Sequence, residues 1–151
     1  MYYSGKKYGH EIGLSCCFRQ HKADSHCNKF HGYALAFEFE FKCDNLDVRN
    51  WVVDFGGLKS LKGILEDCFD HKLLVASDDP MLDMILGLDE LGLADVRELP
   101  AVGCEAFAEY AYALADAWLC DAGYRTRGVF VNYVKVSEHG ANWAKYSEAT
   151  T

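Results

Sequence analysis

The sequence lacks any apolar run long enough to cross a bilayer, and Met1 to His10 lack the apolar segment of a secretory signal. It also lacks an excess of positive charge. The formal net charge is -8, which argues against general nucleic-acid binding. No internal repeat or low-complexity tract is present. These absences predict a cytoplasmic protein that binds neither membranes nor nucleic acids.

The composition predicts one folded domain over residues 1–151. Hydrophobic residues make up 50% of the chain and aromatic residues 14%, as is typical of a globular protein. The seven cysteines are an odd number, and in a reducing compartment we expect free thiols. Cys27 has polar neighbours, whereas four others fall in apolar patterns and are predicted to be buried: Cys43, Cys68, Cys104 and Cys120.

Hydrophobic periodicity predicts an α+β protein in which a four-stranded antiparallel sheet carries two main helices on one face. The clearest signal is the alternation over 33–43, where every second residue is apolar. We also expect a short helix near 81–86 and an irregular segment over 87–99. The strands are expected at 8–18, 33–43, 129–137 and 143–146, and the main helices at 56–69 and 104–120, in the order ββααββ.

Three features are candidates for proton chemistry or ligand binding. Cys27 could be a thiolate base or nucleophile beside imidazoles and Lys29, although an arbitrary loop thiol is more often inert. In the Asp70-His71 pair, a carboxylate could fix the tautomer of the ring, although a histidine also suits a helix C-terminus. Glu138 could accept hydrogen bonds from a guanidine-like ligand edge or be a solvated strand-end residue.

A further candidate is a metal site. Zinc accepts imidazole nitrogen and thiolate sulfur, and a catalytic zinc has three protein ligands. His31 lies near a loop rich in both residue types, but no standard zinc spacing is present. Basic residues also gather here, and a locally positive site would suit a small anionic ligand: Lys6, Lys7, Arg19, Lys22 and Lys29.

Taken together, these positions resemble the 6-pyruvoyl-tetrahydropterin synthase family, including its 6-carboxy-tetrahydropterin synthase subgroup. The resemblance covers nearly the whole chain. It rests on five pieces in order: Cys27 to Gly32 (family C-x-x-x-H-G-H), Trp51 to Lys59 (V-x-D-F-x-x-L-K), Asp70-His71 with Leu74 (D-H-x-x-L), Pro100 with Glu105 (P-T-x-E), and Val134 to Glu138 (V-x-V-x-E).

The resemblance implies the tunnelling fold, assembled as a homohexamer of two stacked trimers with active sites between subunits. It implies a lyase acting on 7,8-dihydroneopterin triphosphate, a pterin substrate, to give 6-carboxy-tetrahydropterin and acetaldehyde for 7-deazaguanine or queuosine synthesis. Cys27 would transfer protons with the Asp70-His71 pair. Glu138 would anchor the pterin, and Glu105 is a second substrate-binding candidate. Zinc would polarise the oxygens of the substrate side chain.

The chain departs from the family at the zinc ligands. The family uses a first-strand histidine and both histidines of H-x-H, but the second of the pair is Tyr33 here. Alignment on Arg19 puts Phe18 at the first-strand position, whereas a two-residue shift puts Cys16 there. Zinc could therefore be held by His31 with Cys16 and a loop histidine, either His21 or His26. It could also be held weakly or be absent.

Two functions follow from these residues. The first is the lyase described above, supported by the presence of the thiol, the acid-imidazole pair and the distant glutamate. The alternative is a zinc-depleted homologue that binds a pterin or purine-like ligand without the standard chemistry. The segment between 78 and 99 is longer than the corresponding connection in a typical family member. Its extra residues could cover or reshape the pocket.

Overall fold

The computed structural model describes residues 1–149, which form a mixed sheet of seven strands with three α-helices. The strands are β1 (Tyr2–Tyr8), β2 (Leu14–Phe18), β3 (His31–Cys43), β4 (Lys72–Ala76), β5 (Asp95–Leu99), β6 (Phe130–Ser137) and β7 (Trp143–Tyr146), and the helices are α1 (Leu58–Phe69), α2 (Leu82–Glu90) and α3 (Cys104–Asp121).

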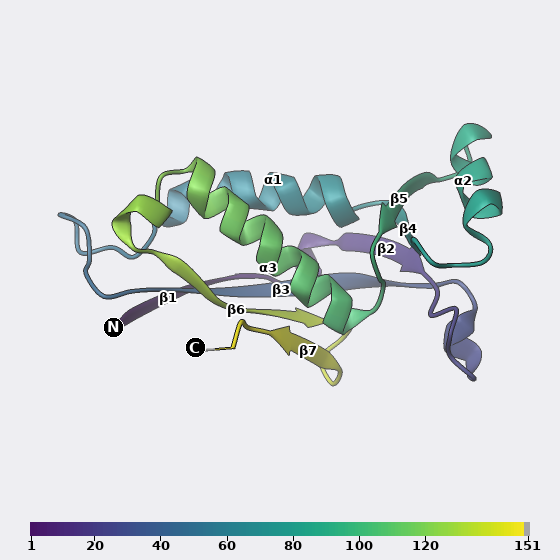
Figure 1. Cartoon of the computed structure of the whole chain (residues 1–151), viewed down its shortest axis with the longest axis horizontal. Helices are drawn as coiled ribbons and strands as arrows, with labels where there is room; N and C mark the ends of the chain where they lie inside the picture. The colour runs from purple at the N-terminus through teal and green to yellow at the C-terminus, as the bar shows by residue number, and fades with distance from the viewer. Residues whose placement is uncertain (150–151) are drawn as a thin grey trace.

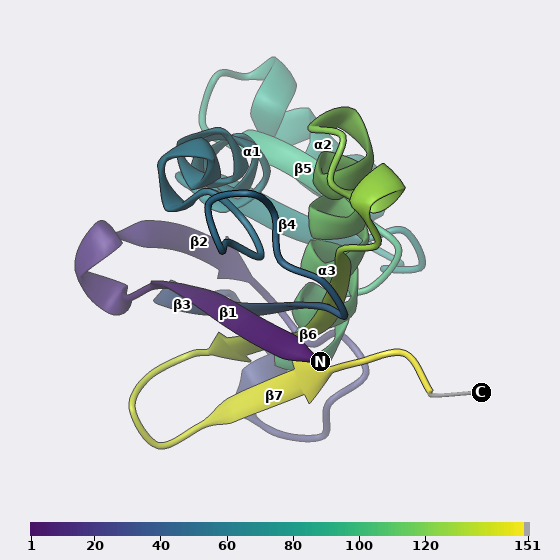
Figure 2. The same ribbon diagram turned by 90° about the vertical axis from the view of Figure 1, so that its left-hand side faces the viewer.

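The long strand β3 organises the sheet. On one edge it pairs with β2 through its first half and with β1 through its second half, and on the other edge it pairs with β6. β7 extends the sheet beyond β6, and all of these pairs are antiparallel. β4 and β5 extend the sheet from β2 and are parallel to it. Figure 2 shows this sheet beneath α1 and α3.

The main core lies between the sheet and the helix pair α1 and α3 (Figure 1). β3 alternates because it buries one face: Leu35, Phe37 and Phe39 are fully buried, whereas Glu38 and Glu40 on the other face are partly exposed. A second, smaller cluster consists of Leu73, Val75 and Ile85, so α2 covers the opposite face of the β4 and β5 region. This part of the sheet is therefore covered on both faces.

Most of the expected elements are confirmed. The helices expected over 56–69 and 104–120 are α1 and α3, and the short helix expected near 81–86 is α2, which continues to Glu90. The strand expected over 33–43 is β3, which extends back to His31. The last two expected strands are β6 and β7.

Three expectations about the fold are wrong. The four-stranded antiparallel sheet is a seven-stranded mixed sheet, because residues 87–99 contain β5 and residues 72–76 form β4. The single strand expected over 8–18 is broken by Gly9 to Gly13, and an additional strand, β1, precedes the break. Cys120 is exposed and not buried, whereas the other three cysteines expected in the core are buried.

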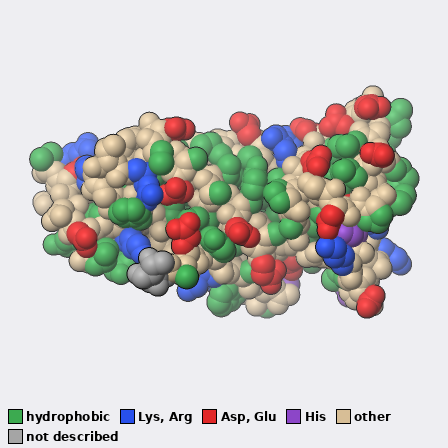
Figure 3. Space-filling model, in the orientation of Figure 1, with side chains coloured by type: hydrophobic (Ala, Val, Ile, Leu, Met, Phe, Trp, Pro, Cys, Tyr) green, Lys and Arg blue, Asp and Glu red, His purple; other side chains and the backbone are tan. Residues whose placement is uncertain are grey.

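The surface carries charges of both signs. On the face shown in Figure 3, Lys and Arg side chains lie apart from one another among acidic and hydrophobic ones. Within residues 1–149, no helix has the length and apolar content needed to cross a membrane.

Candidate active site

The Asp70-His71 pair lies at the turn between α1 and β4, and its side chains meet. Oδ1 of Asp70 lies 2.8 Å from Nδ1 of His71. A carboxylate only accepts hydrogen bonds, so Nδ1 carries the hydrogen and Nε2 of the neutral ring is left as an acceptor. The His71 side chain is 85% exposed. The pair therefore presents an oriented imidazole to solvent.

The backbone holds this imidazole in an unusual conformation. His71 has φ of 56°, in the left-handed region that costs a residue with a β-carbon about 1–2 kcal/mol. Two contacts with β2 hold it there: the His71 amide donates to the carbonyl oxygen of Ser15 at 2.7 Å, and the Ser15 amide donates to Oδ1 of Asp70 at 3.3 Å. Strain of this kind gathers at functional residues.

His71 borders a hollow of about 490 Å³ on the face of the sheet that α2 covers. β2 and β4 supply one side of the hollow. The segment from α2 to β5 supplies the other side, through Leu88, Leu93, Ala94 and Asp95. Residues between α2 and β5 therefore shape the surroundings of the exposed imidazole.

The second group of candidates surrounds Tyr33, on the other face of the sheet. Burial raises the pKa of the Tyr33 phenol, and the neighbouring Glu138 and Cys27 raise it further. Burial, and then the charges of Glu138 and Glu105, raise the pKa of Cys104 to about 12. Glu138 is thus a neighbour of both Tyr33 and Cys104, whereas Cys27 lies near Tyr33 and Glu105 lies near Cys104.

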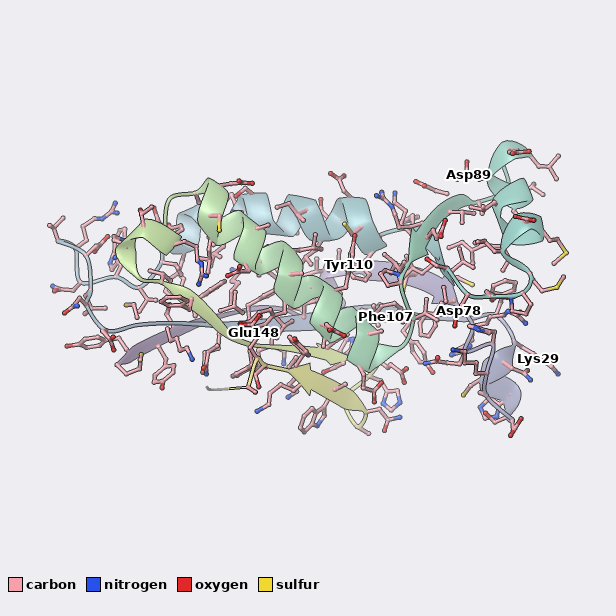
Figure 4. The ribbon with its side chains drawn as sticks, in the orientation of Figure 1. Lys29, Asp78, Asp89, Phe107, Tyr110 and Glu148 are labelled. Carbon is pink, nitrogen blue, oxygen red and sulfur yellow. The ribbon has the colours of Figure 1, made fainter. Side chains whose placement is uncertain are left out.

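Cys27 belongs to a single turn of 3-10 helix, His26–Asn28, in the loop between β2 and β3. Ser25 caps this turn, since its Oγ accepts from the Cys27 amide at 3.3 Å. Lys29 follows on the same loop, at the end of the molecule that also carries α2 (Figure 4). Glu138 lies just after β6, and its amide donates to the Asn142 carbonyl at 3.1 Å. Both residues therefore have defined backbone positions.

A buried ion pair ties the Cys27 loop to the segment after β4. The side chain of Asp79 is 1% exposed and accepts from Nε and Nη2 of Arg19 at 2.9 and 2.6 Å. Nη1 of Arg19 donates to the Asn28 carbonyl at 3.4 Å. The Arg19 hydrogen bonds hold the pKa of the Asp79 carboxyl below its usual range. Sequence reasoning missed Asp79, because an Asp-Asp-Pro segment resembles any polar turn.

The expected cluster of free basic residues is only partly present. Arg19 is committed to Asp79, and Lys22 pairs with Asp78 at 2.6 Å. Lys6 lies over the ring of Tyr8 on β1. Two of the five expected cations are therefore neutralised by carboxylates and do not form an open anion site.

The metal-ligand candidates do not form a zinc site in this structure. The β2 and β3 register puts Phe18 opposite His31 and Cys16 opposite Tyr33. Both candidates for the first-strand position, Phe18 and Cys16, thus lie opposite β3 residues of the H-x-Y segment. Cys16 is 6% exposed, and burial raises the pKa of its thiol to about 12. Within residues 1–149, no group of three or more His, Cys, Asp or Glu side chains is placed to hold a metal ion.

A glycine allows the two strands to approach each other here. A β-carbon on Gly32 would lie 2.6 Å from the carbonyl oxygen of Cys16, which no side chain can accommodate without movement. Gly32 therefore lets β3 lie close to β2 and brings the side chains of His31 and Tyr33 against Phe18. The ring centroids of His31 and Tyr33 are 5.5 Å apart, and both rings lie beside the buried ring of Phe18, so both point to the inner face of the sheet.

The site residues thus form two groups within one chain. The hollow beside His71 is lined by Cys17 and Leu73, which belong to the smaller core cluster under α2. Tyr33, the neighbour of Cys27 and Glu138, packs against the main core under α1 and α3. The structure therefore places Cys27 and Glu138 near Tyr33, whereas the Asp70-His71 pair borders the hollow on the other face of the sheet.

Solved structures show what class of protein has this fold. The chain superposes on an uncharacterized protein from Wolinella succinogenes with a TM-score of 0.81 and 16% identity, covering 98% of each chain. It superposes on the 6-pyruvoyl tetrahydropterin synthase of Plasmodium falciparum with a TM-score of 0.68 and 13% identity, covering 98% of this chain and 99% of the other. The α+β fold is that of the 6-pyruvoyl tetrahydropterin synthases.

Sequence comparison gives the family directly. The family model for 6-pyruvoyl tetrahydropterin synthase matches residues 9–149, and the chain belongs to this family. It is also 29% identical over 140 residues to the 6-carboxy-5,6,7,8-tetrahydropterin synthase of Aquifex aeolicus, covering 90% of this chain and 85% of that protein. The resemblance seen in the sequence is confirmed.

Proposed function

We propose that this protein is a cytoplasmic lyase that converts 7,8-dihydroneopterin triphosphate and water into 6-carboxy-tetrahydropterin, acetaldehyde and triphosphate, at an early step towards 7-deazaguanine bases such as queuosine. Family membership and the name of the Aquifex aeolicus relative support a pterin synthase of this kind. The observation that carries the proposal is the Asp70-His71 pair, whose ring is oriented, exposed and held in a strained backbone.

In this proposal, Cys27 and His71 exchange protons with the side chain of the substrate. Asp70 holds the hydrogen of His71 on Nδ1, so that Nε2 is free to accept a proton at the substrate. Cys27 lies in a partly exposed loop turn, where a thiol can reach a bound molecule. One group removes a proton from a side-chain carbon and the other returns one, as the cleavage of the side chain requires.

Glu138 anchors the pterin ring. The 2-amino group and the adjacent ring N–H of a pterin are two parallel donors, and a carboxylate accepts both in a charge-assisted arrangement. Glu138 is partly buried at the end of β6 beside Tyr33. Glu105, in the first turn of α3, shares the neighbour Cys104 with Glu138. It would support the same edge of the ligand.

A second copy of the chain completes the site. Within one chain, the Asp70-His71 pair and the Cys27-Glu138 group lie on opposite faces of the sheet. A neighbouring protomer could bring its exposed His71 to the Cys27 of the first, so that both residues border one ligand. The family resemblance makes a hexamer of two trimers the assembly that we propose.

The alternative is a protein that binds a pterin or purine-like ligand without this chemistry. The sequence feature that favours it is that, with the chain aligned on Arg19, Phe18 and Tyr33 stand where the family resemblance puts two of the three zinc histidines. Under this alternative, Glu138 would still hold the ligand, whereas Cys27 and His71 would have no role in turnover.

A product assay separates the two functions. The purified protein is incubated with 7,8-dihydroneopterin triphosphate, and 6-carboxy-tetrahydropterin and acetaldehyde are followed by mass spectrometry. The lyase should form both, and Cys27→Ala should abolish their formation while the oligomer stays intact. Cys120→Ala is the matched control, because Cys120 is exposed on α3 away from the candidate site. Ligand binding without product would overturn the lyase and support the binding protein.

A further inference from the structure

We propose that this site is metal-free: the rings of Phe18 and Tyr33 fill the places of two zinc ligands, and His31 serves instead as a hydrogen-bond acceptor for the bound ligand. The part of the proposal that concerns the ligand rests on the proposed function. The part that concerns the metal does not.

The first support is the packing of the three rings. The centroid of Phe18 lies 5.0 Å from that of His31 and 6.1 Å from that of Tyr33, and the last two are 5.5 Å apart. Phe18 is fully buried and meets Phe107 of α3 edge to face at 5.0 Å. The rings therefore contact one another and are held from behind by the core, so Phe18 cannot move aside without opening a cavity.

The second support is the number of donor atoms. A phenyl ring offers none, and a phenol, which ordinarily titrates near 10, stays protonated at neutral pH and is a poor zinc ligand. The three rings together supply one imidazole, whereas a catalytic zinc needs three protein ligands. A lone imidazole holds zinc too weakly to keep it through purification.

The third support is that the possible substitutes are not grouped with His31 as a set of three ligands. Cys16 is two residue pairs along the sheet from the pair of Phe18 and His31, opposite Tyr33, and is buried. His21 lies beside the two carboxylates after β4, with Nε2 3.5 Å from Asp78 and Nδ1 4.0 Å from Asp79, and its buried Nε2 makes no hydrogen bond. Among residues 1–149, no three potential ligands are grouped. A zinc site made from replacement donors therefore has no basis in this arrangement.

His31 nevertheless has a defined orientation. Its Nδ1 lies 2.8 Å from the Lys29 carbonyl oxygen. A carbonyl only accepts, so the hydrogen is on Nδ1 and the lone pair is on Nε2. The ring is partly exposed, so this nitrogen can accept from a hydroxyl or N–H of a ligand. The hydroxylated side chain of dihydroneopterin triphosphate offers such donors.

Zinc titration of the purified protein tests the first part. We expect the wild type to bind less than one zinc ion per chain by calorimetry and to give no tetrahedral cobalt spectrum. Phe18→His/Tyr33→His supplies three imidazoles and should bind one zinc ion per chain. Tyr33→Phe is the matched control, since it keeps the ring and adds no ligand. If the double variant does not fold, Tyr33→His alone is tested. The ring centroid of His139 lies 6.4 Å from that of Tyr33, so His139 would be the third imidazole beside His31 and the new histidine.

One tightly bound zinc ion per wild-type chain, lost in His31→Ala, would overturn the metal-free site. The second part is tested in chelator-treated protein with 7,8-dihydroneopterin triphosphate. There His31→Ala should weaken binding about tenfold, the effect of one lost hydrogen bond. Equal affinity would remove His31 from the ligand site. A chain that binds no zinc and turns over no substrate would overturn the proposed lyase and leave the metal-free site standing.

Discussion

Nδ1 of His71 lies 2.8 Å from Oδ1 of Asp70, although the two residues are neighbours in the chain. Side chains of adjacent residues usually diverge, and here they meet because His71 has a left-handed backbone with φ of 56°. Hydrogen bonds to both backbone groups of Ser15 hold this turn against β2. The orientation of the imidazole therefore costs backbone strain. The hydrogen bonds with Ser15 of β2 offset this cost.

The strain predicts an unusual order of stability at position 71. His71→Gly should unfold with a free energy about 1 kcal/mol higher than that of His71→Ala, because glycine accepts a left-handed backbone without steric cost. Both variants lose the ring, so the comparison isolates the backbone. Urea denaturation measures it. The same two substitutions at Asp67, inside α1, are the control. There the glycine variant should be less stable than the alanine variant. Equal stabilities at position 71 would show that the turn is not strained.

The two carboxylates near Cys104, Glu138 and Glu105, should differ in their effect on the ligand. Glu138→Ala should weaken binding of 7,8-dihydroneopterin triphosphate by about 1–3 kcal/mol, because two donors of the pterin edge would be left unpaired. Glu105 is exposed, so Glu105→Ala should have a smaller effect in the same direction. Glu109→Ala, one turn along α3 and also exposed, is the control. An unchanged dissociation constant for Glu138→Ala would remove this residue from the site.

The elements that bury one face could be predicted from the sequence, whereas those covered on both faces could not. β3 alternates strictly because only one of its faces packs on the helices. β4 shows no alternation, since residues from Leu73 to Ala76 are all buried. Its sequence was therefore interpreted as a loop that connects two elements. β5 pairs with β4, so it was missed with it.

The candidate site could be predicted in part for a related reason. Cys27, Asp70, His71 and Glu138 were found through residue patterns that are local in the chain. The hydrogen bond that holds the Asp70 carboxylate comes from the amide of Ser15, 55 residues away. The position of Phe18 opposite His31 depends on the register between β2 and β3. Contacts between distant segments leave no local pattern, and so neither could be predicted.

Complementation tests whether two copies share one site. Cys27→Ala and His71→Ala should each be inactive alone. Co-expressed with different affinity tags and purified as mixed oligomers, they should recover about a quarter of wild-type turnover, since random pairing joins an intact Cys27 to an intact His71 at one interface in four. The double variant mixed with either single variant is the control and should stay inactive. An inactive Cys27→Ala and His71→Ala mixture would place both residues in a site within one chain or show that they do not act together.

The buried pair of Arg19 and Asp79 should give the protein a measurable acid sensitivity. Asp79→Asn leaves the guanidinium without its charge partner, which should lower the free energy of unfolding by about 3 kcal/mol at neutral pH. The pKa of Asp79 is held below its ordinary value by Arg19, so its contribution is complete above the ordinary carboxyl value, near 3.9, and is lost as the pH falls through the lower folded value. The wild type and the variant should therefore converge in acid.

Asp78→Asn is the matched control for the Arg19–Asp79 ion pair, because Asp78 is 53% exposed. Its surface ion pair with Lys22 should contribute less than about 1 kcal/mol to the free energy of unfolding. Arg19 also donates to the Asn28 carbonyl, so Asp79→Asn should loosen the turn that carries Cys27. Hydrogen exchange over residues 19–29 should then be faster in Asp79→Asn and unchanged in Asp78→Asn. Unchanged exchange in both variants would mean that the ion pair stabilises the fold without positioning the Cys27 loop.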